Sequence, residues 1–485
     1  MKIGIENKIK YAGLIVFLVT AYFSIGHHQS DEHYQILEFA QYKLGHINGN
    51  DLPWEFHEKM RPSMQPWIAF LSIKCLNFIK ITNPFTITIL FRMVSALFLW
   101  LAITSLSKVI CEKYFPEKKW SVFFYCCALL LWFVPYTSVR FSSENYSAAF
   151  LLFGLYFLLR EHKSYWSFFC IGALFGLSVL FRYQLGIAIF GIFLWLFFKA
   201  GITIPKLIPL FVSFLVIIAV GVYLDYLFYN ELVFTSFNYL KLNLIEGKSS
   251  NFGTSPWWYY LFNFLLFAIP PISLILLVSF PIGIWKLKND VFTWCIIPFL
   301  LIHFLIPHKE MRFFFPVSYL FVFISIYGLR EYFQGRKIKG YQLKLFKVSA
   351  GINFILLLFM MFWPANEKVV YYKYLFNNID RGNRTIITTK REIYELMSGL
   401  KTTFYTPDSC HSYFVKSEDE LSGFLKNNSI DSCFYVNRHF EFNGTIEGYN
   451  IIKVYSVYPD WIKNIKGIDW QKTLSTTSIY LLTKR

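Results

Sequence analysis

Three features are missing from this sequence of 485 residues, and each absence excludes a class of protein. Its eight cysteines form no Cys-x-x-Cys pair and no metal-ligand spacing, so we expect no metal site. It contains no internal repeat or low-complexity tract that would indicate a transporter built from repeats. The first apolar segment, Tyr11 to Gly26, has no small-residue cleavage site. We therefore interpret it as a retained helix and not as a signal peptide.

The composition is typical of a membrane protein. Of the residues, 55% are hydrophobic and 21% aromatic, whereas soluble domains rarely bury so much aromatic surface. The net charge of +17 does not indicate nucleic-acid binding, because most Lys and Arg residues occupy short connections between apolar runs. There they orient helices and contact anionic lipid. We predict a polytopic membrane protein that contacts lipid and binds no nucleic acid.

Apolar segments recur up to position 363, and a segment of roughly 20 such residues crosses the hydrocarbon layer. We expect about eleven transmembrane helices, at 9–26, 86–107, 120–137, 143–159, 166–181, 184–199, 206–229, 257–285, 291–307, 312–329 and 346–363. Lys-rich connections then lie in the cytoplasm together with the N-terminus, at 108–119, 160–163, 199–206, 286–288 and 330–347.

The short apolar segment 66–81 decides the topology. A crossing there would break the alternation of the Lys-rich connections, so we predict a juxtamembrane or re-entrant helix. The loop 27–85 and the residues after 363 then lie outside, as do the turns near Arg182 and at 307–311. Nearly all residues suited to chemistry fall on this outer face, so we predict that it is the active face.

After position 363 the sequence becomes polar, with short alternating runs such as Ser432 to Val436 and an amphipathic stretch at 391–400. We predict a small extramembrane α/β domain over 364–485, following a membrane domain over 1–363. Its two cysteines, Cys410 and Cys433, could form a disulfide or remain free.

The segment His27 to Gln35 places acids and histidines where the chain leaves the first predicted helix. Asp31 and Glu32 could accept a proton from a hydroxyl, or they could be a solvated helix cap. Trp54, Glu55 and Arg61 follow in the same loop, and aromatic planes beside carboxylates suit sugar rings. We predict catalysis at Asp31 and Glu32, and acceptor or sugar binding at the later three.

A second cluster, His308, Lys309 and Arg312, lies between two predicted spans on the outer side. It could bind a phosphate, Arg312 through two hydrogen bonds and Lys309 as a point charge, or the side chains could extend to the lipid headgroups. Arg182 and Arg140, on the same face, could add to the phosphate field. Trp257 begins an aromatic run that could anchor the chain at the interface or contact the sugar.

These motifs resemble the Alg9-like mannosyltransferases of glycosyltransferase family 22, which have the GT-C fold. The residues that match the family patterns are Asp31, Glu32, Gln35, Leu52, Trp54, Glu55, Arg61, Ser63, Pro66, the stretch Phe252 to Trp257, and His-Lys-Glu-x-Arg-Phe intact at His308 to Phe313. The sequence departs from the family where Gln29-Ser30 replaces His-Pro, where Pro62 intervenes, and where Ser255 replaces His. These departures bear on the donor or acceptor and not on the reaction class.

The resemblance implies an inverting transfer of mannose from a polyprenyl-phosphate donor to a hydroxyl of a lipid-linked glycan or glycolipid. Asp31 would be the general base, with Glu32 in support. His308, Lys309, Arg312 and Arg182 would hold the leaving phosphate. We expect no cofactor and a monomer.

Two alternatives remain at this point. A transporter or flippase of a lipid-linked sugar would need polar groups near mid-membrane, where the predicted spans are almost wholly apolar. A related GT-C enzyme could instead transfer another sugar to protein or lipid A. The composition favours a bacterial inner membrane with a periplasmic active face. The sequons at Asn383, Asn427 and Asn443 would matter only for the alternative, a luminal site in the endoplasmic reticulum.

Overall fold

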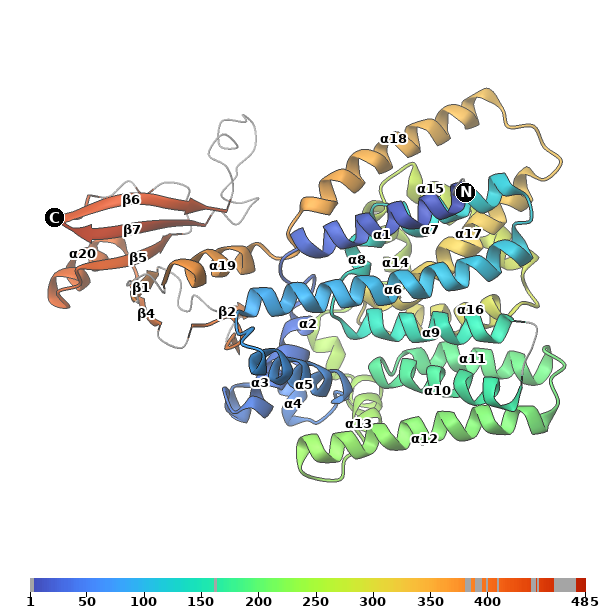
Figure 1. The fold of residues 1–485 in the computed structure, drawn as a ribbon, viewed down its shortest axis with the longest axis horizontal. Helices are drawn as coiled ribbons and strands as arrows, with labels where there is room; N and C mark the ends of the chain where they lie inside the picture. The colour runs from blue at the N-terminus through green and yellow to red at the C-terminus, as the bar shows by residue number, and fades with distance from the viewer. Residues whose placement is uncertain are drawn as a thin grey trace. The chain divides into compact units, whose positions relative to one another are not determined.

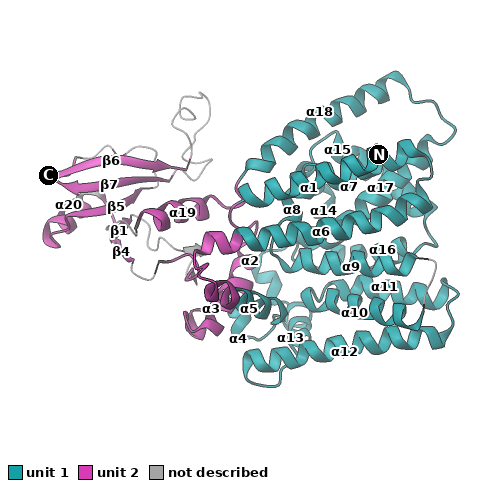
Figure 2. Ribbon diagram, viewed as in Figure 1, with its two compact units in different colours: residues 1–24, 54–72, 89–363 teal, residues 25–53, 73–88, 364–485 magenta. Residues whose placement is uncertain are grey.

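The computed structural model describes residues 4–160, 164–379, 385–388, 395–397, 400–407, 410–437, 442, 445–457 and 477–485. The chain divides into two compact units, coloured separately in Figure 2. Unit 1 contains residues 1–24, 54–72 and 89–363, and unit 2 contains 25–53, 73–88 and 364–485. The predicted boundary at 363 thus recurs in this division, but two stretches of the first loop are grouped with the C-terminal residues.

Unit 1 is helical, as the apolar runs predict, and its helices lie side by side in Figure 1. They are α1 (Ile5–Phe23), α4 (Trp54–His57), α7 (Lys118–Leu130), α8 (Phe133–Ser138), α9 (Ser143–Leu159), α10 (Tyr165–Phe181), α11 (Leu185–Phe198), α12 (Ile204–Tyr229), α13 (Thr235–Leu240), α14 (Tyr259–Phe267), α15 (Ile272–Lys286), α16 (Val291–Leu305), α17 (Ser318–Phe333) and α18 (Gly340–Phe362). Short π and 3-10 helices are η3 (Lys241–Ile245), η4 (Lys248–Phe252) and η5 (Met311–Val317). Helices α5 (Met64–Phe78) and α6 (Pro84–Tyr114) contribute to both units.

Each predicted span coincides with one or two of these helices, while the number of membrane crossings stays a prediction. Among the described residues, four helical stretches are long and apolar enough to cross a membrane: Pro84–Tyr114, Ile204–Tyr229, Met311–Phe333 and Gly340–Asn378. Four shorter helices are also apolar: α10, α11, α15 and α16. The segment predicted not to cross, 66–81, forms most of α5.

Two predicted spans are interrupted. Between α14 and α15 the chain contains Pro270 and Pro271, and proline lacks the N–H that a continuous helix needs. Between α7 and α8 the side chain of Asn353 from α18 accepts a hydrogen bond from the Trp132 N–H and donates one to the Leu130 carbonyl. The break between α7 and α8 is therefore stabilised by polar groups that replace the lost helical bonds.

Close packing of α11 against α16 fixes two segments that carry candidate site residues. A Cβ at Gly191 in α11 would lie 1.9 Å from the carbonyl oxygen of Trp294 in α16, so no larger residue fits there. Small residues let membrane helices approach this closely. Arg182 precedes α11 and His308 follows α16, so the helix pair holds the backbones that carry them in a fixed relation.

Unit 2 joins a short helical segment near the start of the chain to a C-terminal sheet. Its elements are α2 (Ser30–Glu32), η1 (His33–Glu38), α3 (Phe39–Leu44), η2 (Gly49–Asp51), α19 (Glu367–Ile379), α20 (Glu418–Asn427), β1 (Thr385–Thr388), β2 (Glu395–Met397), β3 (Leu400–Lys401), β4 (His411–Phe414), β5 (Ser432–Asn437), β6 (Tyr449–Ser456) and β7 (Ser478–Lys484). One sheet has the order β4-β1-β5-β7-β6, with β4, β1 and β5 parallel and the last two pairings antiparallel. Strands β2 and β3 pair separately.

The core of this region forms where Leu421 and Leu425 of α20 pack with Ile387, Cys433 and Tyr435 of the sheet. The prediction of a small C-terminal α/β region is thereby confirmed. Cys410 and Cys433 are not joined by a disulfide. Of the amphipathic stretch, 391–394 and 398–399 lie outside the described residues, and its described part is strand.

Candidate active site

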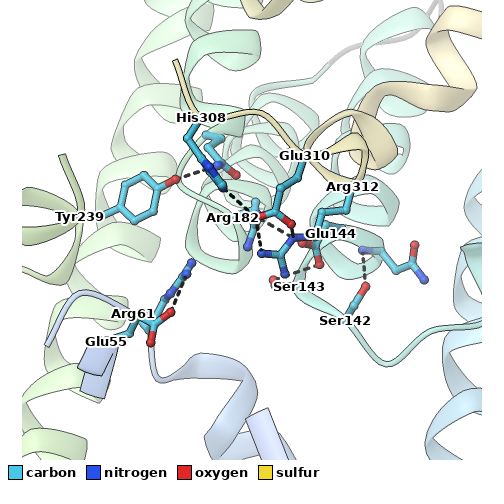
Figure 3. A network of polar contacts seen from close by, with 12 residues as sticks. Glu55, Arg61, Ser142, Ser143, Glu144, Arg182, Tyr239, His308, Glu310 and Arg312 are labelled. Atoms are coloured by element: carbon cyan, nitrogen blue, oxygen red, sulfur yellow. Dashed lines mark hydrogen bonds and ion pairs between the residues drawn. The ribbon is translucent and has the colours of Figure 1, made fainter. Parts of the chain in front are cut away.

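The His-Lys-Glu-x-Arg-Phe motif forms a turn after α16 in which one carboxylate engages two cationic or ionisable side chains. Glu310 accepts a hydrogen bond from Arg312 Nη2 at 3.0 Å, and its second oxygen lies in ion-pair contact with Arg312 Nε at 2.8 Å. The same carboxylate lies 3.1 Å from Nε2 of His308. Arg312 therefore turns one edge of its guanidinium toward the carboxylate, and the two nitrogens of such an edge suit a carboxylate or a phosphate. Figure 3 shows this group together with Glu55 and Arg61.

Arg182, more than 120 residues earlier in the sequence, joins this motif through an aromatic ring. The guanidinium carbons of Arg182 and Arg312 each lie 5.7 Å from the centroid of the Phe313 ring. Arg182 also pairs with Glu144 at 3.1 Å, and both side chains are buried. The structure thus brings Arg182 to the cations of the motif, as the phosphate prediction requires.

These cations are strongly shielded from water. Arg182, Lys309 and Arg312 are 6%, 5% and 7% exposed, and together they outnumber the carboxylates of Glu144 and Glu310. Burial lowers the pKa of the Lys309 ammonium below its ordinary value, and this group donates to the Ile306 carbonyl. Because the effective dielectric is low in such a place, the surplus of positive charge favours binding of an anion. Side chains extended to lipid headgroups would be more exposed, so burial argues against that alternative.

The loop before α14 contacts the turn at 307–308. His308 Nδ1 lies 2.9 Å from the Gly253 carbonyl oxygen, and the Ser255 N–H donates to the Pro307 carbonyl at 2.9 Å. Phe252 connects this contact to Trp54: its ring centroid lies 6.4 Å from that of His308 and 5.8 Å from that of Trp54, which it stacks upon. A candidate sugar-binding residue is therefore one aromatic ring away from the cation cluster.

Glu55 and Arg61 form an ion pair in the same unit. Arg61 Nη2 lies 3.5 Å from Glu55 Oε1, and its guanidinium lies over the Tyr239 ring at 5.9 Å. Their loop is fixed by Asp225 of α12, which accepts from the Ser63 N–H at 2.8 Å and from its hydroxyl at 2.6 Å. This arrangement holds Arg61 beside α12 and α13.

Trp257 differs from the other candidates because its side chain is 64% exposed. It lies beyond the contacts that tie 253 and 255 to the turn at 307–308. This exposure suits the alternative of interfacial anchoring at least as well as contact with a sugar.

Asp31 and Glu32 belong to unit 2 and form the short helix α2 between His27 and His33. Both acids are partly exposed. The carboxylate of Glu32 accepts a hydrogen bond from the His28 N–H at 3.2 Å. Glu32 therefore has a local structural function. Asp31 is the first of the two acids in the family motif.

Sequence reasoning missed or misjudged several residues of these networks. Glu144 pairs with Arg182 and not with Arg140, which is closer in sequence and donates to the Ser24 carbonyl at 3.0 Å. Asp225 was not singled out, although an acid within the predicted span 206–229 was a readable signal. No feature of the sequence pointed to Tyr239 as a partner of Arg61. Within the described part of the chain, no group of three or more His, Cys, Asp or Glu could hold a metal ion.

Comparisons with known proteins agree with this architecture. The GPI mannosyltransferase 3 of Candida albicans is 26% identical over 330 residues, which are 66% of this chain and 63% of the relative. The GPI mannosyltransferase 3 of Yarrowia lipolytica is 27% identical over 339 residues, which are 64% of this chain and 62% of the relative. The alpha-1,2-mannosyltransferase ALG9 of Saccharomyces cerevisiae is 30% identical over 207 residues, which are 40% of this chain and 35% of the relative. The chain thus spans less than two thirds of the length of these relatives.

The chain is also similar to the solved structures of ArnT from Cupriavidus metallidurans. The TM-score is 0.53 for the apo state and 0.51 for the form bound to undecaprenyl phosphate. Each alignment covers 98% of this chain and 97% of the other, at 10% identity. The likeness shows the fold, which is GT-C as predicted, with a small C-terminal sheet region. The model of the Alg9-like mannosyltransferase family matches residues 9–413, which are most of the chain, so the chain belongs to that family.

Proposed function

We propose that this protein is an inverting glycosyltransferase that moves mannose from a polyprenyl-phosphate donor to a hydroxyl of a lipid-linked glycan or glycolipid. The observation that carries the proposal is the burial of three cations, Arg182, Lys309 and Arg312, of which the two arginines lie over the Phe313 ring. Such a cluster suits a leaving group that departs as an anion. A similar fold has been solved with undecaprenyl phosphate bound, which supports a lipid phosphate as the ligand.

In this reaction Asp31 takes the proton of the acceptor hydroxyl as its oxygen attacks the anomeric carbon of mannose. The bond from that carbon to the phosphate oxygen breaks, and its electron pair leaves with the polyprenyl phosphate. Arg312 and Lys309 stabilise the developing negative charge, while Arg182 adds to the field. A single displacement inverts the anomeric carbon and requires no covalent intermediate.

The acceptor would be held by Trp54, Glu55 and Arg61. Trp54 offers an aromatic plane for a sugar face, and the Glu55–Arg61 pair offers an acceptor and donors for its hydroxyls. Trp257 and Glu32 have weaker structural support for these functions, for the reasons given above.

We place the reaction on the membrane face opposite the N-terminus, as the positive-inside rule predicts. The relatives named above are eukaryotic proteins, which favours the luminal face of an endoplasmic reticulum over the bacterial periplasm suggested by composition. Of the three sequons, Asn383 and Asn443 lie outside the described residues.

The test is an in vitro assay with polyprenyl-phosphate mannose and candidate lipid-linked acceptors, in which the product linkage is determined. Asp31→Asn should insert and fold but lose at least about 100-fold in kcat, the usual contribution of a general base. Asp51→Asn, in the same unit, is the matched control and should transfer normally. Near-normal turnover by Asp31→Asn would exclude Asp31 as the base. Movement of the donor across vesicles without any transfer would favour the flippase alternative.

A further inference from the structure

The segment that carries Asp31 is held at its upstream end by residues from far later in the sequence. The backbone N–H groups of Ala365 and Asn366 donate to the Ile25 carbonyl, at 2.8 and 3.1 Å. The side-chain nitrogen of Asn366 lies 3.2 Å from Nε2 of His27. Gly26 adopts a φ of +94°, and a Cβ there would lie 2.7 Å from the Cβ of Asn366. The two chain segments therefore pack so closely at Gly26 that a larger residue would clash with Asn366.

The downstream end is held by a second C-terminal segment. Glu38, at the end of η1, is 0% exposed and lies 2.7 Å from Nε2 of His33. Its carboxylate also accepts from the Phe404 N–H at 3.2 Å and from the Thr403 hydroxyl. Nearby, the Tyr34 hydroxyl donates to the Leu400 carbonyl at 2.6 Å.

Aromatic contacts connect the two ends. The rings of His27 and His33 lie 5.6 Å apart, and Tyr405 stacks on His33 at 5.3 Å with an interplanar angle of 13°. Tyr405 also stacks on Phe85 at 5.0 Å. Asp31 lies in α2 between the two histidines, so the segment that presents it is fixed on both sides.

A buried carboxylate with these partners is a strong constraint on local geometry. Removing one donor leaves part of the charge unsatisfied, which the surrounding structure resists. Position matters because a general base must lie within hydrogen-bond reach of its proton, and a shift of about 1 Å can cost roughly 100-fold in rate. The π-helical form of η1 agrees with this view, since π turns occur often at functional sites.

We propose that residues 364–366 and 400–405, here called the C-terminal frame, position Asp31 for catalysis. In this view Glu38, His33 and Thr403 are positioning residues that act through Asp31 and do not touch substrate. The inference rests on the proposed function of Asp31, and it gives a function to the C-terminal region that the family motifs do not. The histidines around Asp31 then serve the frame and not the proton transfer.

Thr403→Val tests the frame, because it removes one hydroxyl and keeps the side-chain shape. We expect kcat to fall about tenfold, the equivalent of about 1.4 kcal/mol in the barrier. The donor KM should stay as in the wild type, and the protein should stay folded at the assay temperature although its thermal unfolding midpoint falls, because one hydrogen bond to the buried Glu38 carboxylate is lost. Thr403→Ser restores the hydroxyl and should restore kcat. The matched control is Thr406→Val, since the Thr406 hydroxyl donates to the Thr402 carbonyl within the same turn.

The frame is excluded if Thr403→Val has a normal kcat, or if Thr406→Val loses kcat equally. It is also excluded if the loss is accompanied by an equal loss of folded protein and is not rescued by Thr403→Ser. Glu38→Gln provides a second variant, for which kcat should also fall while the donor KM stays as in the wild type. If Asp31→Asn is inactive while both frame variants are normal, the frame alone fails. If Asp31→Asn is active, Asp31 is not the general base, and the frame proposal is rejected together with that function.

Discussion

Replacing Arg312 by lysine separates its charge from its geometry. The guanidinium engages both oxygens of Glu310, at 2.8 and 3.0 Å, and is almost fully buried. In the proposed reaction the phosphate of the donor takes over this edge of the guanidinium and accepts two hydrogen bonds from it. Lysine keeps the positive charge but offers a point donor, so it cannot form two parallel bonds to one phosphate. Arg312→Lys should therefore weaken donor binding even though the net charge of the site is unchanged.

The size of the effect follows from the loss of one charge-assisted hydrogen bond. Such a bond contributes about 1.5–3 kcal/mol in a shielded site, which corresponds to roughly 10- to 150-fold in the donor Kd. Arg312→Ala should cost more than Arg312→Lys. It removes the second bond as well and leaves the Glu310 carboxylate beside the phosphate without its main partner.

The assay is a titration of purified enzyme in nanodiscs with polyprenyl phosphate, together with separate KM values for donor and acceptor. Arg330→Lys is the control, because Arg330 also faces a carboxylate, donating two hydrogen bonds to Glu117 at 3.1 and 2.9 Å, and belongs to a predicted cytoplasmic connection. Its donor affinity should match the wild type. Equal effects of Arg312→Lys on donor and acceptor KM, or equal effects of the two variants on donor affinity, would refute the phosphate function of Arg312.

Three further predictions concern protonation, stability and topology. Because burial lowers the pKa of Lys309, its ammonium loses the proton at a lower pH than an exposed lysine. As the pH rises, kcat/KM for the donor should therefore start to decline before the ordinary lysine pKa of about 10.4 is reached. Lys309→Arg stays charged and should move that decline to higher pH, and an unchanged pH profile would count against this assignment. Asp225→Asn should lower the free energy of unfolding by about 1–3 kcal/mol and raise the acceptor KM, since the Ser63 loop loses its carboxylate partner; chemical denaturation in detergent measures the first, and unchanged stability would contradict it. Reporter fusions at Asn48 and Asn83 should lie on the same side of the membrane, and opposite sides would mean that α5 crosses it.

The helices were predictable because their signal is local. A long apolar run bounded by Lys or Arg is itself the physical reason for a membrane helix, so each predicted span has its helix in the structure. The break at Pro270–Pro271 could also have been read from the sequence, because two adjacent prolines cannot continue a helix. The break before α8 had a similar local signal in Pro135, but its stabilising contact with Asn353, more than 200 residues away in sequence, could not be read.

The sequence offered candidate residues for the site, but it could not indicate how their side chains pair. The motif at 308–313 indicated a phosphate site from its cations alone, whereas the structure places Glu310 between two of the motif's side chains. The donor must therefore compete with a carboxylate that already occupies the guanidinium. Likewise, Arg182 meets the motif through a contact between segments far apart in sequence, and such a contact leaves no trace in either segment.

The cluster around Asp31 shows why adjacency in a sequence is a poor guide to function. His27, Asp31 and His33 look like one chemical group, yet the two histidines contact the C-terminal residues Asn366 and Tyr405. The chain up to position 363 contains every predicted site residue, but it lacks the partners that fix Glu38 and both histidines. If the geometry of the base limits the rate, the sequence that determines the rate therefore extends well beyond the family motifs.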